Sequence, residues 1–361
     1  MNLELTDEQV ALRDTVRRYL TEKASVTTHV RPMLDDPMGT TSEVWAGLAA
    51  LGATGVLVPQ EYGGSGMTMV EAGVVAEELG AALHPGPWLS SAVAAVRALT
   101  RLVTGEDAAS LLTGIAEGST VATVGPLTGP RPTADGDVLR GEISALPDAA
   151  AAGVVLVLAD YGSSTGLFAI DATSAGVSVT EQTHVDPTRK LFNVTFDDVR
   201  AQRLASPSAD DIGGLVDDVL IAYAADALGA ATAVMNLAVD YAKVRRQFDQ
   251  PIGSFQAVQH LCVDMYETVE LARSGVLQAM WAADAAPPAE RHLAAVRAKA
   301  FAGQLATVAD TAIQVFGGIG YTWEHDAHLY LKRLLGWSAF LGGSDKYLQE
   351  LGRQLAMAVS S

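Results

Sequence analysis

Ala312-Ile313-Gln314-Val315-Phe316-Gly317-Gly318-Ile319-Gly320-Tyr321 is the stretch of sequence that decides the fold. Its first part has helical character, and the predicted helix ends on Gln314 and runs into a glycine turn. Three glycines in four positions permit positive φ angles and let another molecule approach the bare backbone. Because these glycines follow a helix and not a strand, they do not form a Rossmann fingerprint.

The chain around this stretch divides by composition into a helical part, a β part and a second helical part. Helical spacing begins with a capping-box pattern at Thr6 and Gln9. The middle part has short runs rich in β-branched and aromatic residues, separated by Gly, Asp, Ser and Pro, which predict a β domain. The predicted strands are Val154–Leu158, Leu167–Ile170, Val177–Val179 and Leu191–Phe196. The predicted C-terminal helices lie near 215–246, 255–284, 288–316 and 340–357.

Composition excludes several classes of function. The 361 residues fit two or three domains, and the formal charge of −18 argues against a nucleic-acid partner. No uninterrupted apolar run reaches about 18 residues, so we expect no membrane span. Cys262 is the only cysteine, which rules out an internal disulfide and fits a cytoplasmic location. His260 and Cys262 point to different faces of a predicted helix, so we expect no metal site.

Two further motifs lie upstream of the opening stretch: Arg245-Arg246-Gln247-Phe248 and Ile252-Gly253-Ser254-Phe255-Gln256. The three motifs together resemble the C-terminal helical domain of the acyl-CoA dehydrogenases. Val58–Gly64, followed by Glu77-Glu78-Leu79-Gly80, resembles the N-terminal signature of the same family. The resemblance covers nearly the whole chain and implies a mainly α fold with a central β domain. It implies an N-terminal helical domain (1–117), a middle β-barrel or sandwich (118–210) and a C-terminal four-helix bundle (211–361).

The resemblance also implies FAD as cofactor and an acyl-CoA thioester as substrate. In the family, the matching segments hold the FAD of a neighbouring subunit, and the forked guanidinium of Arg245 suits its pyrophosphate. The other matching positions are Phe248, Ile252, Phe255, Gln256, Gln314, Gly317 and Gly318. Asp249 replaces the usual glycine, and its charge is unfavourable near a pyrophosphate unless the side chain points away. The alternative is a solvated basic pair at a helix end and an ordinary glycine C-cap.

The family reaction needs a carboxylate within reach of the proton on the carbon next to the thioester. The two positions at which family members carry this glutamate fall on Leu341 and Val219. Asp218 is a weak candidate for a relocated base, because it lies one residue away, or about 100° around a helix. The alternative is that Asp217 and Asp218 are acidic residues at a helix N-terminus. The sequence therefore predicts no catalytic residue with assurance.

The flavin-facing part of the β domain also departs from the family. Val121–Pro130 lacks the usual Thr-Glu-Pro and Gly-Ser-Asp patterns, and Ile143–Pro147 replaces a Trp-Ile-Thr run. Retained contacts for a neighbour's cofactor and an altered site of its own resemble the base-lacking subunit of actinobacterial heteromeric (α2β2) acyl-CoA dehydrogenases. In those enzymes of steroid side-chain β-oxidation, a homologous partner supplies the glutamate.

Three functions follow as hypotheses. The first is this base-lacking subunit, active in a complex with a glutamate-bearing homologue. The second is a self-sufficient or repurposed flavoenzyme, a homodimer or homotetramer, with a relocated base such as Asp218. The third is a flavin-free scaffold that kept the fold and lost catalysis.

Overall fold

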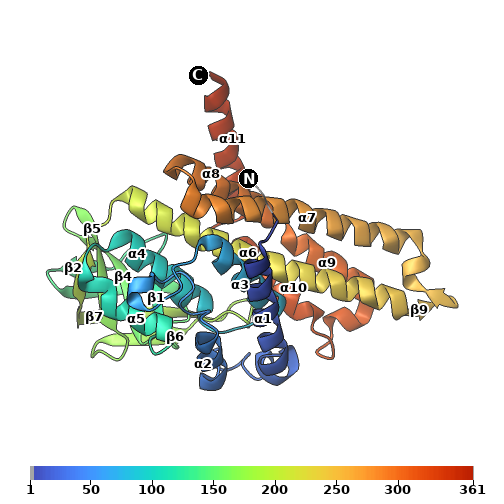
Figure 1. The fold of residues 1–361 in the computed structure, drawn as a ribbon, viewed down its shortest axis with the longest axis horizontal. Helices are drawn as coiled ribbons and strands as arrows, with labels where there is room; N and C mark the ends of the chain where they lie inside the picture. The colour runs from blue at the N-terminus through green and yellow to red at the C-terminus, as the bar shows by residue number, and fades with distance from the viewer. Residues whose placement is uncertain (1–3, 361) are drawn as a thin grey trace.

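The structure is a computed structural model that describes residues 4–360 and the side chains of residues 4–356. Helices come first, a sheet lies in the middle of the chain, and helices follow, in the order predicted. Figure 1 shows the sheet at one end of the elongated molecule. Helix α6 (Ala209–Val244) runs from beside the sheet to the opposite end of the molecule, and α7 (Gln256–Ala285) lies alongside it toward that end. The C-terminal end of α6 is therefore remote from the sheet.

The N-terminal part begins with α1 (Asp7–Lys23), which is capped as predicted. The Thr6 hydroxyl accepts a hydrogen bond from the Gln9 backbone, and the Gln9 side chain accepts one from the Thr6 backbone. The remaining α-helices are α2 (Ser42–Ala50), α3 (Met69–Ala81), α4 (Val96–Leu102) and α5 (Ala109–Glu117). Shorter helical turns are η1 (Val26–Val30), η2 (Gln60–Tyr62), η3 (Leu89–Ala95) and η4 (Glu106–Ala108).

Helix α3 packs on α6 with almost no space between the two backbones. A Cβ added at Gly80 would lie 1.9 Å from the Asp226 backbone oxygen, and one added at Gly229 would lie 1.8 Å from the Glu77 backbone oxygen. Since real Cβ atoms do not approach this closely, only glycine permits the crossing. The crossing joins the N-terminal helices to the central helix of the C-terminal part.

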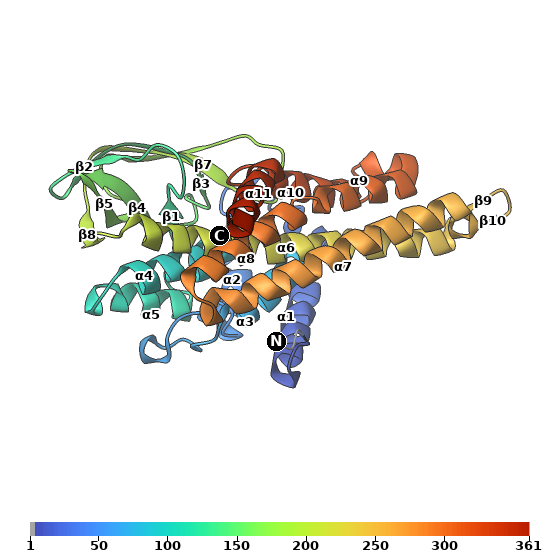
Figure 2. The same ribbon diagram turned by 90° about the horizontal axis from the view of Figure 1, so that it is seen from above.

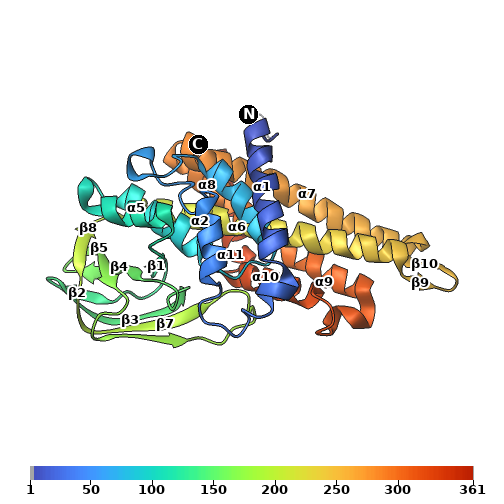
Figure 3. The same ribbon diagram turned by 60° about the horizontal axis from the view of Figure 1, so that its bottom comes forward.

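The middle of the chain forms one eight-stranded sheet in the order β6-β7-β3-β2-β4-β5-β8, with β1 paired in parallel to β4. Figure 3 shows the sheet curving over, with β4 and β5 on one side and β3 and β7 on the other. In β4, Val155 and Val157 point into the sheet's own core, whereas Leu156 and Leu158 point to the main helical core. The strands are β1 (Ala122–Gly125), β2 (Thr133–Asp135), β3 (Val138–Pro147), β4 (Val154–Tyr161), β5 (Ser164–Asp171), β6 (Val177–Glu181), β7 (Leu191–Arg200) and β8 (Gln202–Ala205).

The four predicted strands lie within β4, β5, β6 and β7, each of which is longer than predicted. Four strands of the structure were not predicted: β1, β2, β3 and β8. β2 and β8 are only 3 and 4 residues long and partly exposed, so they carry little hydrophobic pattern. β3 is interrupted by register shifts and exposes Arg140, Gly141 and Glu142, which hides its alternation. Short or irregular strands of this kind are set by pairing with neighbours and not by local pattern.

The C-terminal part differs from prediction in its helix breaks. The single helix predicted over 288–316 is two helices, α8 (Pro288–Ala302) and α9 (Leu305–Phe316). Helix α9 ends at Phe316, two residues beyond Gln314, where the glycine turn was predicted to begin. A Cβ at Gly303, in the break, would lie 2.8 Å from Ser344 Cβ, so glycine at this position leaves room for Ser344. The helix predicted over 340–357 begins at Ser344, as α11 (Ser344–Ser360), and α10 (Ala327–Ala339) was not predicted.

Helix α6 is long and apolar enough to cross a membrane by length and hydropathy, the one such helix in the described chain. Of its most apolar window, 83% is buried inside the protein. Figure 2 shows α6 alongside α7, between the sheet and the N-terminal helices. Its hydropathy therefore reflects a core position.

Candidate active site

A cavity of about 380 Å³, here called the chamber, lies between the central sheet and the C-terminal helices. β1, β3 and the connection between β6 and β7 form its sheet side, and η3, α6 and α10 form its helix side. Most of the lining side chains are apolar. The chamber therefore suits an apolar ligand or the apolar part of one.

Both positions predicted for the catalytic glutamate line this chamber. Val219 lies on α6 and is buried, and Leu341 follows α10 in a left-handed conformation with φ 54°. The described residues that line the chamber include no aspartate and no glutamate. Its titratable side chains are His184 and Tyr223, and burial raises the pKa of the Tyr223 hydroxyl. The chamber wall therefore offers no carboxylate to abstract a proton.

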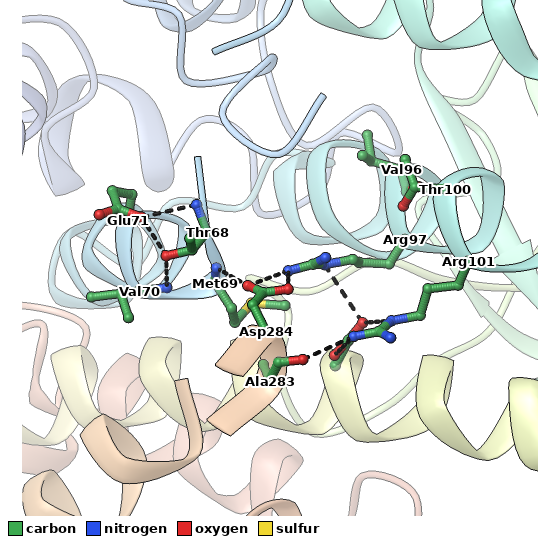
Figure 4. Close-up of polar contacts among 11 residues, drawn as sticks. Thr68, Met69, Val70, Glu71, Val96, Arg97, Thr100, Arg101, Ala283 and Asp284 are labelled. Carbon is green, nitrogen blue, oxygen red and sulfur yellow. Dashed lines mark hydrogen bonds and ion pairs between the residues drawn. The ribbon is translucent and has the colours of Figure 1, made fainter. Parts of the chain in front are cut away.

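Asp218 does not face the chamber, although its neighbour Val219 does. Its carboxylate is fully buried against Arg101, which donates two hydrogen bonds to it, and Arg97 lies 3.5 Å away. Figure 4 shows Arg97 reaching on to Asp284, at the end of α7. Burial raises the pKa of Asp218, and the two guanidinium groups oppose that rise. This geometry fits a structural ion pair and not a base for the chamber.

The alternative assignment of the Asp217–Asp218 pair to a helix N-terminus is wrong. Helix α6 begins earlier, at Ala209, with Ser208 as its cap and Asp211 completing the capping box. Asp217 lies within the helix and is buried, and its carboxylate contacts His292 Nδ1 at 2.8 Å. Both carboxylates therefore join α6 to other elements.

The residues predicted to hold a neighbour's cofactor gather at the end of the molecule that is remote from the sheet. Arg245 ends α6 and leads into a hairpin of β9 (Arg246–Gln247) and β10 (Gln250–Pro251). The hairpin precedes α7, and Gln314, Gly317 and Gly318 lie where α9 ends. The rings of Tyr241 and Phe316 are 5.1 Å apart, which places the two segments side by side.

These residues are open to contact. Arg245, Gln256 and Gln314 are exposed, and a Cβ added to Gly317 or Gly318 would meet nothing within 4 Å. Gly317 has a φ of 65°, as predicted for this turn. Ile252 and Phe255 are half-buried beneath them.

Phe248 and Asp249 form the tip of the hairpin. Phe248 is 87% exposed, and its ring meets that of Phe255 edge-on, with centroids 6.1 Å apart. Both tip residues have positive φ angles, 52° and 63°, which are unfavourable for residues other than glycine. An exposed aromatic ring on a strained turn is a feature of a contact surface. The Asp249 side chain makes no contact within the described chain that would fix its direction.

Two features beside the chamber were not predicted. Tyr223 and Phe340 stack with ring centroids 4.2 Å apart and form part of its wall. Behind them, Asp226 binds Arg333 at 2.7 Å and Arg189 at 2.6 Å. Burial alone would raise the pKa of Asp226, but the two guanidinium groups outweigh it and lower the pKa. The available signal was that Asp226 is the one charged residue between positions 219 and 239 of α6, because a buried carboxylate needs a partner.

Comparison with known proteins identifies the family of the chain. The family described as acyl-CoA dehydrogenase, N-terminal domain, matches residues 6–119, and that described as acyl-CoA dehydrogenase, C-terminal domain, matches residues 221–356. The chain belongs to the acyl-CoA dehydrogenase family, whose cofactor is FAD and whose members are oxidoreductases acting on acyl-CoA.

Within that family, the chain is 33% identical to the acyl-CoA dehydrogenase IpdE2 of Mycobacterium tuberculosis, over 96% of each chain. Among solved structures, it is similar to a chain of the Tcur3481-Tcur3483 steroid ACAD G363A variant, with a TM-score of 0.88 and 29% identity, over 98% of this chain and 99% of that one. It is also similar to a chain of the ChsE4-ChsE5 complex from Mycobacterium tuberculosis, with a TM-score of 0.90 and 26% identity, over 99% of both chains.

Proposed function

We propose that this chain is the base-lacking subunit of a heteromeric FAD-dependent acyl-CoA dehydrogenase, active in a complex with a glutamate-bearing homologue. The observation that carries the proposal is the chamber, into which both possible base positions project as Val219 and Leu341. Desaturation of an acyl-CoA requires removal of a proton from the carbon next to the thioester. Since the described chamber wall has no carboxylate, the base would come from the partner.

This chain would contribute cofactor contacts to the complex from the end of the molecule that is remote from the sheet, where the β9–β10 hairpin and the glycine turn after α9 lie. The guanidinium of Arg245 is exposed and free for a pyrophosphate, which binds well to a forked donor. The open backbone at Gly317 and Gly318 can approach a dinucleotide closely, and Gln314 lies beside them. Phe248, Ile252, Phe255 and Gln256 would continue the contact. FAD, when bound, supplies the hydride acceptor, and these residues would hold it in the neighbouring subunit's site.

The similar proteins support a bulky thioester substrate and a two-component assembly. One similar structure is described as a steroid ACAD, and both are named for two components. We infer that the substrate of the complex is a steroid-type acyl-CoA thioester processed by β-oxidation, and that the assembly is an α2β2 heterotetramer. The division into domains at 117 and 210, and the cytoplasmic location inferred from the lone Cys262, belong to the same proposal.

The second hypothesis, a self-sufficient enzyme with Asp218 as its base, is less well supported. The Asp218 carboxylate is held by Arg101 and Arg97 and lies outside the chamber. A flavin-free scaffold remains the third possibility, and the exposed Arg245 and glycine turn argue against it.

Purification of the chain alone and together with a glutamate-bearing homologue tests the proposal. We expect colourless protein when the chain is alone, and stoichiometric flavin that acyl-CoA reduces when the two chains are together. Flavin bound and reduced by the isolated chain would favour a self-sufficient enzyme. Absence of flavin with every homologous partner would favour the scaffold.

A further inference from the structure

A second, smaller cavity of about 60 Å³, here called the annex, adjoins the chamber. Tyr223, Gly336 and Phe340 line both cavities, so the stacked rings of Tyr223 and Phe340 form part of a shared wall. Both cavities have mainly apolar surfaces, but aspartate, lysine and arginine side chains are among the residues that line the annex, and none of the described residues that line the chamber is of these types. Together the two cavities form an apolar space with one polar end.

Asp186 brings an unpartnered carboxylate oxygen to this polar end. The residue is 1% exposed and lines the annex. Its Oδ1 accepts hydrogen bonds from the backbone and hydroxyl of Thr188, at 2.9 and 2.6 Å, but its buried Oδ2 has no partner. Oδ2 lies beside Gly336, 3.7 Å from where a Cβ would stand, and Gly336 lines both cavities. A buried carboxylate oxygen without a hydrogen bond is costly, so a donor is missing here.

The cations of the annex cannot supply that donor. Arg189 and Arg333 are both bound to Asp226, and the Lys190 ammonium donates to the Leu34 backbone oxygen at 2.5 Å. At the boundary of the two cavities, the Tyr223 hydroxyl makes no hydrogen bond within the described chain. The site therefore presents a free acceptor, Asp186 Oδ2, and a free hydroxyl, that of Tyr223, next to an apolar space.

We propose that the chamber and annex bind an apolar molecule through a hydroxyl group at one end. The hydroxyl donates a hydrogen bond to Asp186 Oδ2 and accepts one from Tyr223, and the apolar body fills the chamber. A hydroxyl satisfies both protein groups, whereas an ether or a carbonyl can satisfy only the tyrosine. This inference rests on the proposed function in one respect: the chamber of this chain is free of flavin.

The test uses the full-length chain and two probes that share one apolar body, 4-cyclohexylcyclohexanol and its methyl ether. Calorimetric titration should show one bound alcohol per chain, with an affinity at least about tenfold higher than that of the ether, which lacks the donor. Asp186→Asn should abolish this preference because it places an amide donor at the acceptor position. Tyr223→Phe should weaken alcohol binding, and Tyr161→Phe, on β4 outside both cavities, should leave it unchanged.

Equal affinity for the alcohol and the ether would mean that the annex holds water only, and the proposal would be wrong. Failure of the alcohol to bind, or binding that survives both Asp186→Asn and Tyr223→Phe, would also overturn it. If Asp186→Asn does not fold, Tyr223→Phe carries the test alone. Because the titration uses neither flavin nor a partner subunit, its failure leaves the proposed function intact. Flavin retained by the isolated chain would instead contradict the proposed function.

Discussion

At the scale of single residues, the catalytic role of this chain depends on what Val219, Leu341 and Asp218 can reach. The first two line the chamber and carry no titratable group, and the third is titratable but lies outside it. Asp218 is instead an anchor, because its carboxylate neutralises Arg101 and Arg97 between α4, α6 and α7. A buried ion pair of this kind is destabilising to break, since removal of one partner leaves the other charge uncompensated.

Asp218→Asn should therefore lower the free energy of unfolding by about 3 kcal/mol without a specific loss of turnover in the assembled enzyme. Denaturant unfolding measures the first effect and the rate per bound flavin measures the second. Asp240→Asn, an exposed change on the same helix, is the control and should alter neither. Unchanged stability with lost turnover would restore Asp218 as the base.

The sequence predicted the place of some of these residues and not the surroundings of others. It identified Val219 and Leu341 because the flanking motifs fixed their register, and the structure places both at one cavity. It could not identify the surroundings of Asp218, because Arg97 and Arg101 are more than a hundred positions away in the chain. The Tyr223–Phe340 stack and the pairing of Asp226 with Arg333 are long-range contacts of the same kind. Such contacts follow from helix packing, which local patterns do not specify.

At the scale of elements, close helix packing depends on a few glycines. Gly229→Ala on α6 should destabilise the protein by about 3 kcal/mol or more, because the new methyl group would collide with the backbone of α3. Gly213→Ala on the same helix meets nothing within 4 Å and should stabilise it by about 0.5–1 kcal/mol. Denaturant midpoints compare the two variants. Equal effects would mean that α3 and α6 do not cross as described.

A second element-level prediction concerns the contact of α11 with α6 and α8. His292 on α8 lies 2.8 Å from Asp217 and 2.7 Å from Glu350 on α11, and chiefly its hydrogen bond with Asp217 raises its pKa from 6.5 to about 9. The folded protein therefore binds this proton more tightly than the unfolded chain does. The resulting stability is complete below pH 6.5 and disappears as the pH rises through about 9.

His292→Gln should remove this part of the pH dependence of the unfolding free energy. His260→Gln, at an exposed position on α7, should leave it unchanged. Denaturant unfolding at a series of pH values between 6.5 and about 9 measures how steeply the unfolding free energy changes with pH. An identical slope in wild type and His292→Gln would show that the histidine does not hold its proton in this way.

Helix and strand boundaries were predictable where residues close in the sequence set them, and were not predictable where contacts between distant residues set them. The capping box of α1 was predictable because its two residues are three positions apart. The break between α8 and α9 was not predicted, and the close approach of Ser344 to Gly303 beside it is a long-range contact that local pattern does not specify. The short strands β2 and β8 were missed for a similar reason, since their partners and not their patterns define them.

At the scale of the whole molecule, the sheet, which forms one side of the chamber, and the β9–β10 hairpin lie at opposite ends, as Figures 1 and 2 show. One chain could therefore contribute its hairpin end to a neighbour's site while its own chamber serves another purpose. In the assembled enzyme, Arg245→Gln should weaken flavin retention by roughly tenfold or more, because charged hydrogen bonds to the pyrophosphate would be lost. Arg200→Gln, at an exposed position on β7, should have no effect. Flavin absorbance after dialysis measures the difference, and equal retention would exclude this role for Arg245.

The location of the base is tested most directly by the rate at which acyl-CoA reduces the flavin of the assembled enzyme in a single turnover. Replacement of the partner subunit's catalytic glutamate by glutamine should slow this reduction by about a hundredfold or more. Asp218→Asn in this chain should leave the rate per bound flavin unchanged. The opposite pattern, with reduction slowed by Asp218→Asn and insensitive to the partner's glutamate, would contradict the assignment of this chain as the base-lacking subunit.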